Sequence, residues 1–337
     1  MARPRIADAP MPVTIVGGCL GAGKTTLINH LLAHAGDNRL AVIFNDFGQV
    51  PPARPPSASP CVEVRLSSGC ICCRATTEFI VALAQVRSHH TRPDHVLVEA
   101  SGASDLTAVA ESARLHGLRV EATVVVADAE AIRAQAVHAR RGHRLRRQLL
   151  AADLVVLNKA ELLGRRERTS VYDWLAGFIA RPRVVEVSFG RVPTSLIVDG
   201  APEITHHEPV QVPTAPEREF AFWSWSRPAP LDAGAFRWWA ASLPEGVLRA
   251  TGVVHFAHEP QQRHRFQLVG SRWSVARSGG WAGEPPHSAL ALVGHAGTFD
   301  PRLLDLRIGS CIAEPGAATA LSPAGRPSPY VELAASH

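Results

Sequence analysis

Two short stretches of the sequence concentrate residues that can do chemistry. GCLGAGKT, from Gly18 to Thr25, fits the phosphate-binding pattern G-x-x-x-x-G-K-[ST]. GCICC, from Gly69 to Cys73, places three of the six cysteines within four positions: Cys70, Cys72 and Cys73. The first stretch predicts a phosphate site. The second leaves three alternatives open, which are a disulfide, a buried turn or a soft-metal site.

The glycine-rich stretch follows an apolar run, VTIVGG, and precedes a helical pattern, which is the context that a P-loop requires. Its glycines allow backbone amides to turn inward around phosphate oxygens, and a helix N-terminus faces the same anion. Lys24 would neutralise the β- and γ-phosphates, and the Thr25 hydroxyl would bind Mg²⁺. The predicted nucleotide contacts in this loop are Gly18, Gly21, Ala22, Gly23, Lys24, Thr25 and Thr26.

Acidic residues end two further apolar runs and are candidates for a role at the same site. Glu99 ends HVLVE, and Asp46 ends LAVIFND. Ligands of open α/β sheets bind beyond the carboxyl ends of the strands, which favours a functional role over a turn or capping role. Glu99 would hold a water of the Mg²⁺ shell, and Asp46 lies in a segment that would respond to nucleotide. Gly102 would offer an amide to the γ-phosphate, whereas Asp128 is expected to cap the next helix. The predicted catalytic residues are Lys24, Thr25 and Glu99.

The stretch VVLNKAEL, residues 155–162, resembles the N-K-x-D element with which GTPases bind guanine. Asn158 would brace neighbouring loops, and Lys159 would stack on the base. Glu161 replaces the usual Asp, and its extra methylene group displaces the carboxylate. A guanine preference is therefore expected, although a weaker one than Asp would give. Ser188 is predicted to lie in the last loop that contacts the base.

The elements that position these residues alternate along the first half of the chain. Continuous apolar runs separated by helical patterns predict a mostly parallel sheet covered on both faces, that is, the α/β class and a P-loop NTPase fold. The predicted strands span residues 13–18, 40–46, 61–66, 95–101, 122–129, 153–159 and 183–188.

The pattern changes near Gly190. A proline-rich segment without periodicity predicts a linker, and strand-like runs with one helical pattern then predict a small α+β domain. One of these runs, residues 263–276, is predicted as a single strand. The predicted organisation is a P-loop domain at 1–192, a linker at 193–218, a C-terminal domain at 219–315 and a disordered tail at 316–337.

Composition argues against several classes of protein. The net charge of +5 is modest for 337 residues, and the basic cluster at 138–150 is interpreted as a solvated helix face. No run approaches the roughly 20 apolar residues of a membrane span, and the first ten residues contain no apolar signal core. We therefore expect a cytoplasmic protein with no nucleic-acid or membrane partner. Stable disulfides are rare in the cytosol, which weakens that alternative for the cysteine triplet.

Metal binding is the favoured interpretation of the triplet, ahead of a structural turn and of redox chemistry. Thiolates prefer soft or borderline ions, and Zn²⁺ takes four ligands. Cys70, Cys72 and Cys73 would converge if the chain turned at Gly69, and Asp46, a water or a partner could complete the shell. An incomplete protein shell suits a carrier, because exchange of the ion needs an open position.

In their order along the chain, these motifs resemble those of the CobW-type GTPases, relatives of the UreG and HypB metal-insertion GTPases. The resemblance covers roughly residues 11–311 and rests on these stretches: GGCLGAGKTTLINHLL, NDFG, GCICC, VEASG, QLLAADLVVLNKAEL, SFGRV, GVLRATGVV and LALVGHAGTFD. It implies a CobW-type C-terminal domain, slow GTP hydrolysis with Mg²⁺, and delivery of Zn²⁺ or Co²⁺ to a client metalloprotein. A homo-oligomer is compatible with it.

The segment that should respond to nucleotide departs from the family pattern N-E-F-G-E. Asp46 and Gln49 replace its two glutamates, and a proline-rich stretch without acids follows. The predicted function is a GTP-hydrolysing metallochaperone. One alternative is a non-catalytic metal sensor or buffer, which the altered acids favour. A P-loop small-molecule kinase is less favoured, because the N-K-x-E element and the cysteines argue against it.

Overall fold

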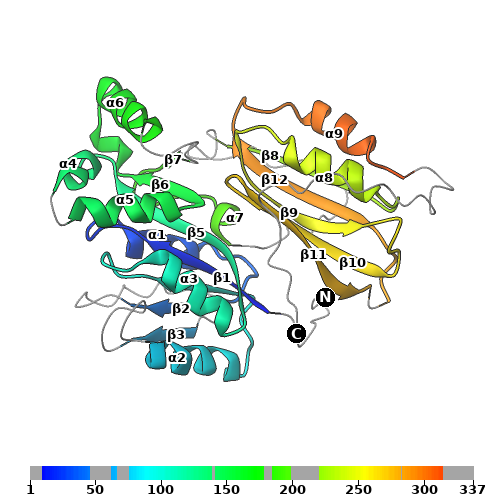
Figure 1. Cartoon of the computed structure of the whole chain (residues 1–337), viewed down its shortest axis with the longest axis horizontal. Helices are drawn as coiled ribbons and strands as arrows, with labels where there is room; N and C mark the ends of the chain where they lie inside the picture. Colours follow the sequence, from blue (N-terminus) through cyan, green and yellow to red (C-terminus); the bar gives the residue numbers. More distant parts are fainter. Residues whose placement is uncertain are drawn as a thin grey trace.

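The computed structural model describes residues 10–45, 62–66, 76–138, 141–177, 184–198, 220–281 and 283–313. They form two sheets, each with its own helices (Figure 1). Asp46 and the three cysteines at 70, 72 and 73 lie outside the described residues. No helix in the described ranges is long and apolar enough to cross a bilayer.

The first sheet has seven strands in the order β3-β2-β4-β1-β5-β6-β7, and all neighbours are parallel. This confirms the predicted parallel sheet. The strands are β1 Met11–Gly17, β2 Leu40–Phe44, β3 Val62–Arg65, β4 His95–Glu99, β5 Leu118–Asp128, β6 Leu154–Asn158 and β7 Val184–Glu186. The helices are α1 Lys24–Ala33, α2 Thr76–Ser88, α3 Leu106–Leu115, α4 Ile132–Val137, α5 Arg141–Ala151, η1 Ala160–Leu162, α6 Arg165–Ala176 and α7 Thr194–Ile197.

The strands of this sheet are apolar on both faces because helices cover both. Every residue of β2, β4 and β6 is buried. One core cluster joins the sheet to α2, α3, α5 and α6, and a second joins it to α1 and α7. The carboxyl ends of the parallel strands meet at one edge of the sheet, which we call the nucleotide edge, and it carries the loop after β1.

The second sheet is antiparallel, with the strand order β11-β10-β9-β12-β8, and α8 and α9 cover one face. It confirms the predicted α+β domain. The prediction of one strand over 263–276 is wrong, since Gly270, with φ of 59°, turns the chain into a β10–β11 hairpin. The elements are β8 Phe220–Arg227, α8 Ala233–Ala241, β9 Val247–His255, β10 Gln262–Val269, β11 Arg272–Gly280, β12 Ser288–His295 and α9 Pro301–Gly309.

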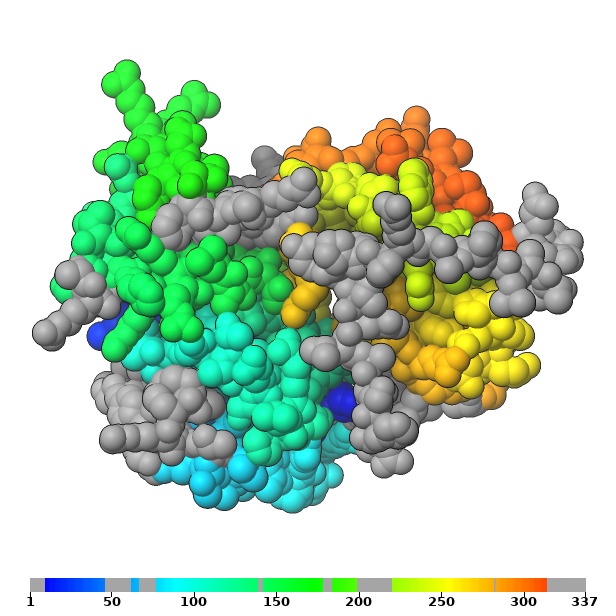
Figure 2. All heavy atoms as spheres, viewed as in Figure 1, coloured from blue at the N-terminus to red at the C-terminus, as the bar shows by residue number. Residues whose placement is uncertain are grey.

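The two sheets share an apolar contact, and the green and cyan atoms of the first domain lie beside the yellow and orange atoms of the second in Figure 2. Leu248, Val269 and Val293 of the second sheet belong to the same buried cluster as Val124 and Leu154 of the first. Helix α7 lies at the start of the predicted linker and contributes to this cluster as well. The described part of that segment is therefore packed against both sheets.

A buried carboxylate, Glu121 of β5, forms the polar part of the contact. Its side chain is fully buried. Its carboxylate oxygens lie 2.6 Å from Nε of Arg119, 3.8 Å from Nη2 of Arg249 and 4.0 Å from Nη2 of Arg265. Gln267 also donates to it. Burial alone would raise the pKa of Glu121, but the surrounding arginines lower it. The carboxylate is therefore charged and compensated, and it links the two sheets.

Replacing Glu121 with Gln should destabilise the fold strongly. Arg249, whose side chain is 3% exposed, would lose its buried counter-charge. Breaking such a pair costs about 3 kcal/mol or more, measured as the free energy of unfolding in urea. The matched control is Glu259→Gln, which removes the charge of a partly exposed acid that pairs with the exposed Arg277 and with His264, and which should cost less than about 1 kcal/mol. Equal losses in the two variants would contradict the role of Glu121.

A buried histidine, His95 of β4, gives the same interface a pH dependence. Its Nε2 lies 2.9 Å from the Thr14 hydroxyl oxygen. That hydroxyl donates its hydrogen to the carbonyl of Ile197, so it accepts from His95, which is neutral with the proton on Nε2. Burial lowers the pKa of His95 to about 3.

The free energy of unfolding should fall as the pH drops below about 6.5, because His95 then binds a proton in the unfolded state but not in the folded state. The sign follows from a folded pKa below the unfolded one, and the slope approaches about 1.4 kcal/mol per pH unit between pH 6.5 and pH 3. Urea unfolding at pH 7.5, 6.0 and 5.0 measures it. His95→Gln should remove this part of the slope, whereas the exposed His90→Gln should retain it. Identical slopes in both variants would refute the assignment to His95.

Candidate nucleotide-binding site

The loop between β1 and α1 has backbone conformations that require glycine. Gly18, Gly21 and Gly23 have φ angles of 130°, 80° and 102°. A Cβ atom at Gly18 would lie 2.0 Å from the carbonyl oxygen of Val126, and one at Gly23 would lie 2.3 Å from Nδ2 of Asn158. The loop can therefore approach neighbouring backbone closely, and it ends where α1 offers its first free amides.

The residues predicted for phosphate and magnesium lie together at the nucleotide edge. Lys24 is 4% exposed, and its ammonium donates to the carbonyl of Cys19 at 3.3 Å. The Thr25 hydroxyl donates to Glu99 Oε1 at 2.9 Å. Gly102 approaches the loop so closely that a Cβ there would lie 3.1 Å from the amide nitrogen of Leu20. A hydroxyl and a carboxylate side by side are oxygen ligands of the kind that Mg²⁺ prefers.

Asn158 joins the P-loop to the loop after β7. Its Nδ2 donates to the carbonyl of Ala22 at 2.9 Å, and its Oδ1 accepts from the amide of Gly190 at 2.8 Å. Ser188 is half-buried in the loop that Asn158 holds, and Glu161 is exposed in η1. These bonds are of the kind that the predicted bracing role requires. The base-binding roles of Lys159, Glu161 and Ser188 stay predictions, as does the contact assigned to Thr26, which is exposed on α1.

Sequence reasoning missed the main partner of Lys159. The Lys159 ammonium lies 2.6 Å from Asp128 Oδ2, and Asp128 also accepts from the amides of Glu130 and Ala131. The expected capping role is wrong, because α4 begins after Ala131 without a side-chain cap and Asp128 instead holds the turn before that helix. The missed signal was the position of Asp128 at the end of a strand, which in a parallel sheet puts it beside the end of β6.

The segments that carry Asp46 and the cysteines leave the described chain at the same edge. The amide of Asn45 donates to the carbonyl of Glu99 at 3.0 Å, and the amide of Leu66 donates to the carbonyl of Phe44 at 3.0 Å. Within the described ranges, no group of three or more His, Cys, Asp or Glu side chains could hold a metal ion. The metal role of the triplet stays a prediction.

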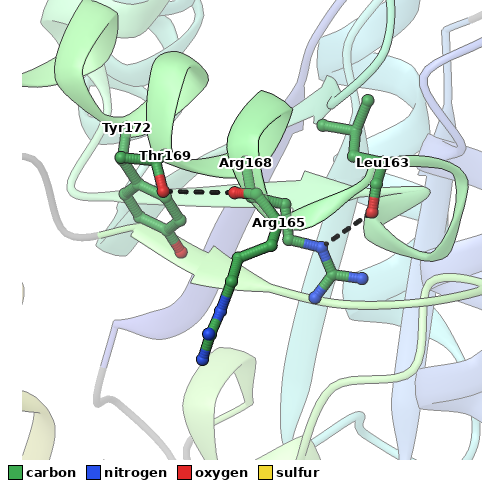
Figure 3. Close-up of a pocket in the computed structure, with 5 residues that line it drawn as sticks. All are labelled: Leu163, Arg165, Arg168, Thr169 and Tyr172. Atoms are coloured by element: carbon green, nitrogen blue, oxygen red, sulfur yellow. Dashed lines mark hydrogen bonds between the residues drawn. The ribbon is translucent and has the colours of Figure 1, made fainter.

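An open hollow in the described part of the chain lies elsewhere and is lined by no residue predicted for nucleotide. It has a volume of about 590 Å³, beside η1 and along α6 (Figure 3). Arg168 turns back to donate to the carbonyl of Leu163 at 3.2 Å, and Thr169 donates to the carbonyl of Arg165 at 3.1 Å. The lining residues are Leu163, Arg165, Arg168, Thr169 and Tyr172.

The parallel sheet, the glycine loop and the Lys-Thr helix start define a P-loop nucleotide-binding protein. Residues 12–185 match the model of the CobW/HypB/UreG nucleotide-binding domain, and residues 220–312 match that of the cobalamin synthesis protein cobW C-terminal domain. The chain belongs to the CobW/HypB/UreG family, and the resemblance seen in the motifs is confirmed.

Curated relatives carry names that refer to zinc. The chain is similar to a zinc chaperone CobW of Sinorhizobium sp (29% identity over 87% of this chain and 95% of the relative). It is also similar to the zinc chaperone YjiA of Escherichia coli (26% identity over 85% and 94%). The solved Zn(II)-bound YjiA GTPase from Escherichia coli aligns over 90% of this chain and 99% of its own, with 19% identity and a TM-score of 0.44.

Replacing Asn158 with Ala should loosen the site and destabilise the domain. The carbonyl of Ala22 and the amide of Gly190 would each lose a partner. At roughly 1 kcal/mol for each bond, the free energy of unfolding should fall by about 2 kcal/mol, and GDP binding measured by calorimetry should weaken. The control is Asn38→Ala, which removes one local bond to Ala35 and should leave GDP affinity unchanged. Unaltered GDP binding in the Asn158 variant would argue against the bracing role.

Proposed function

We propose that the protein is a GTP-dependent metallochaperone. It binds a zinc-like ion at Cys70, Cys72 and Cys73 and transfers it to a client metalloprotein in the cytoplasm. GTP with Mg²⁺ occupies the P-loop, with Thr25 and Glu99 beside the metal. One observation carries the proposal: the chain enters the Asp46 segment beside Glu99 and the cysteine segment beside Phe44, both at the nucleotide edge.

The order of the strands makes contact between these parts feasible. β3, β2, β4 and β1 are successive neighbours in the sheet. Neighbouring strands lie about 4.8 Å apart, so the end of β3 is about 10 Å from the end of β4, where Glu99 lies. Asn45 is bonded directly to the backbone of Glu99. A change at the γ-phosphate therefore has a short path to Asn45 and Leu66, the residues that precede the two segments.

The relatives support the choice of cargo and nucleotide. Two of them are named zinc chaperones, and one from Schizosaccharomyces pombe is named a zinc-regulated GTPase metalloprotein activator. Sulfur ligands accept Co²⁺ as well as Zn²⁺, and affinity order alone does not decide between them in a cell. We take Zn²⁺ as the first ion to test.

The proposed cycle is an order–disorder switch of a known type. GTP·Mg²⁺ orders the segment after Asp46 against the cysteines and completes the metal site. Hydrolysis releases that segment and lowers the affinity for the ion. Intrinsic hydrolysis is expected to be slow, so that the loaded state lasts until a client binds.

Zn²⁺ should bind more tightly in the GTP state than in the GDP state. The test is chelator competition with Mg²⁺ and a non-hydrolysable GTP analogue, repeated with Mg²⁺ and GDP. Coupling between sites commonly amounts to a factor of about 5–150. Because coupling is reciprocal, Zn²⁺ should raise the affinity for the analogue by the same factor.

Two variants separate the parts of the proposal. Lys24→Ala should abolish nucleotide binding and leave Zn²⁺ affinity at its nucleotide-free value. Replacing Cys70, Cys72 and Cys73 with Ser should abolish tight Zn²⁺ binding and leave GDP binding intact. Equal Zn²⁺ affinities in the two nucleotide states would indicate a sensor or buffer. A preference for ATP over GTP would favour a kinase.

A further inference from the structure

We infer that Asp128 is a positioning residue for recognition of the nucleotide base. Its carboxylate holds the ammonium of Lys159, so that the lysine stem lies along the base site and the charge is kept away from the phosphates. This inference rests on the proposed nucleotide binding and assigns a residue to it beyond the known motifs.

The position of Asp128 is set by the sheet. It is the last residue of β5 and lies opposite Asn158, the last residue of β6, in the parallel register. The amide of Ala129 donates to the carbonyl of Asn158 at 2.8 Å, which carries this pairing one step beyond the strand. Asp128 therefore stands beside the residue that immediately precedes Lys159.

The carboxylate is oriented independently of the lysine. Its Oδ1 accepts from the amide of Glu130 at 3.0 Å and from that of Ala131 at 3.2 Å. Its Oδ2 is left for the ammonium of Lys159, at 2.6 Å. The side chain of Asp128 is 10% exposed and that of Lys159 is 34% exposed. The backbone amides therefore fix the carboxylate of Asp128, and this carboxylate in turn fixes the end of the longer Lys159 side chain.

The backbone of Lys159 is held in an unusual conformation. Its φ is 63°, in the left-handed region that non-glycine residues seldom adopt. Phe189, with φ of 56°, is the one other non-glycine residue with positive φ among the described residues. Lys159 directly follows Asn158, and Phe189 directly precedes Gly190. The amide of Gly190 donates a hydrogen bond to the side chain of Asn158. Such strained conformations persist where surrounding contacts fix them, and they cluster at functional sites.

The positive charge of Lys159 explains why an ion pair with Asp128 would assist recognition of the base. An untethered ammonium near a triphosphate would be drawn to the phosphate oxygens. Lys24 already supplies a cation in the P-loop and is held at the carbonyl of Cys19. By pairing with Asp128, the ammonium of Lys159 gains a counter-charge and is held at the end of β5. The two lysines then serve different parts of one ligand.

The test compares two probes, GDP and inorganic pyrophosphate, each with Mg²⁺, by calorimetry. Asp128→Asn keeps the size of the side chain and an oxygen for the two amides, but it loses the charge. GDP should bind about tenfold more weakly, a factor that corresponds to about 1.4 kcal/mol, with pyrophosphate changed less than about twofold. Lys159→Ala should give a similar result, and the double variant should be no worse than either single one.

Asp105→Asn is the matched control. Asp105 also accepts from two backbone amides, those of Thr107 and Ala108, and pairs with a cation, Arg147, at 2.6 Å. Asp105→Asn should change the affinity for GDP and the affinity for pyrophosphate by the same factor. Unchanged GDP affinity in folded Asp128→Asn, or equal losses for both probes, would overturn the positioning role. If the wild-type protein bound neither probe, the proposed function itself would fall.

Discussion

The two hydrogen bonds of Asn158 are the constraint on which the nucleotide edge depends. They join the P-loop, through Ala22, to the loop after β7, through Gly190. Gly23 leaves the space that the Asn158 amide occupies, and Gly190 packs so closely on α1 that a Cβ would lie 2.9 Å from the amide of Leu27. One side chain thus fixes two loops that are separated by about half of the chain. The interface between the two sheets keeps β5 and β6, the strands that carry Asp128 and Asn158, in place.

Much of the first domain could be predicted from the sequence because its signals are local. Continuous apolar runs predicted the parallel strands, and the G-x-x-x-x-G-K-[ST] pattern placed its loop where the structure has it, between β1 and α1. Strand-like runs and one helical pattern extended the prediction to an α+β second domain, and the family motifs agreed with it. The β10–β11 hairpin was missed because its turn contains only Gly270 and Ser271 between two strand-like runs.

The longer-range features could not be predicted in this way. In the sequence, Glu121 is a single acidic residue within a strand. Two of its arginine partners, Arg249 and Arg265, are more than a hundred residues away along the chain. Asp128 and Lys159 are 31 residues apart and meet only because β5 and β6 are neighbours. Sequence patterns specify the elements, whereas such pairs depend on which strands become adjacent.

The placement of the Glu121 cluster has a mechanical consequence. Glu121 and Asp128 lie on the same strand, seven residues apart, which at about 3.3 Å per residue is about 23 Å. The second domain is therefore attached far from the nucleotide edge, at the part of β5 that pairs with β1 before the pairing with β6 begins at Val124. In a cycle driven by the phosphates, it would serve as the stationary frame against which the short loops move.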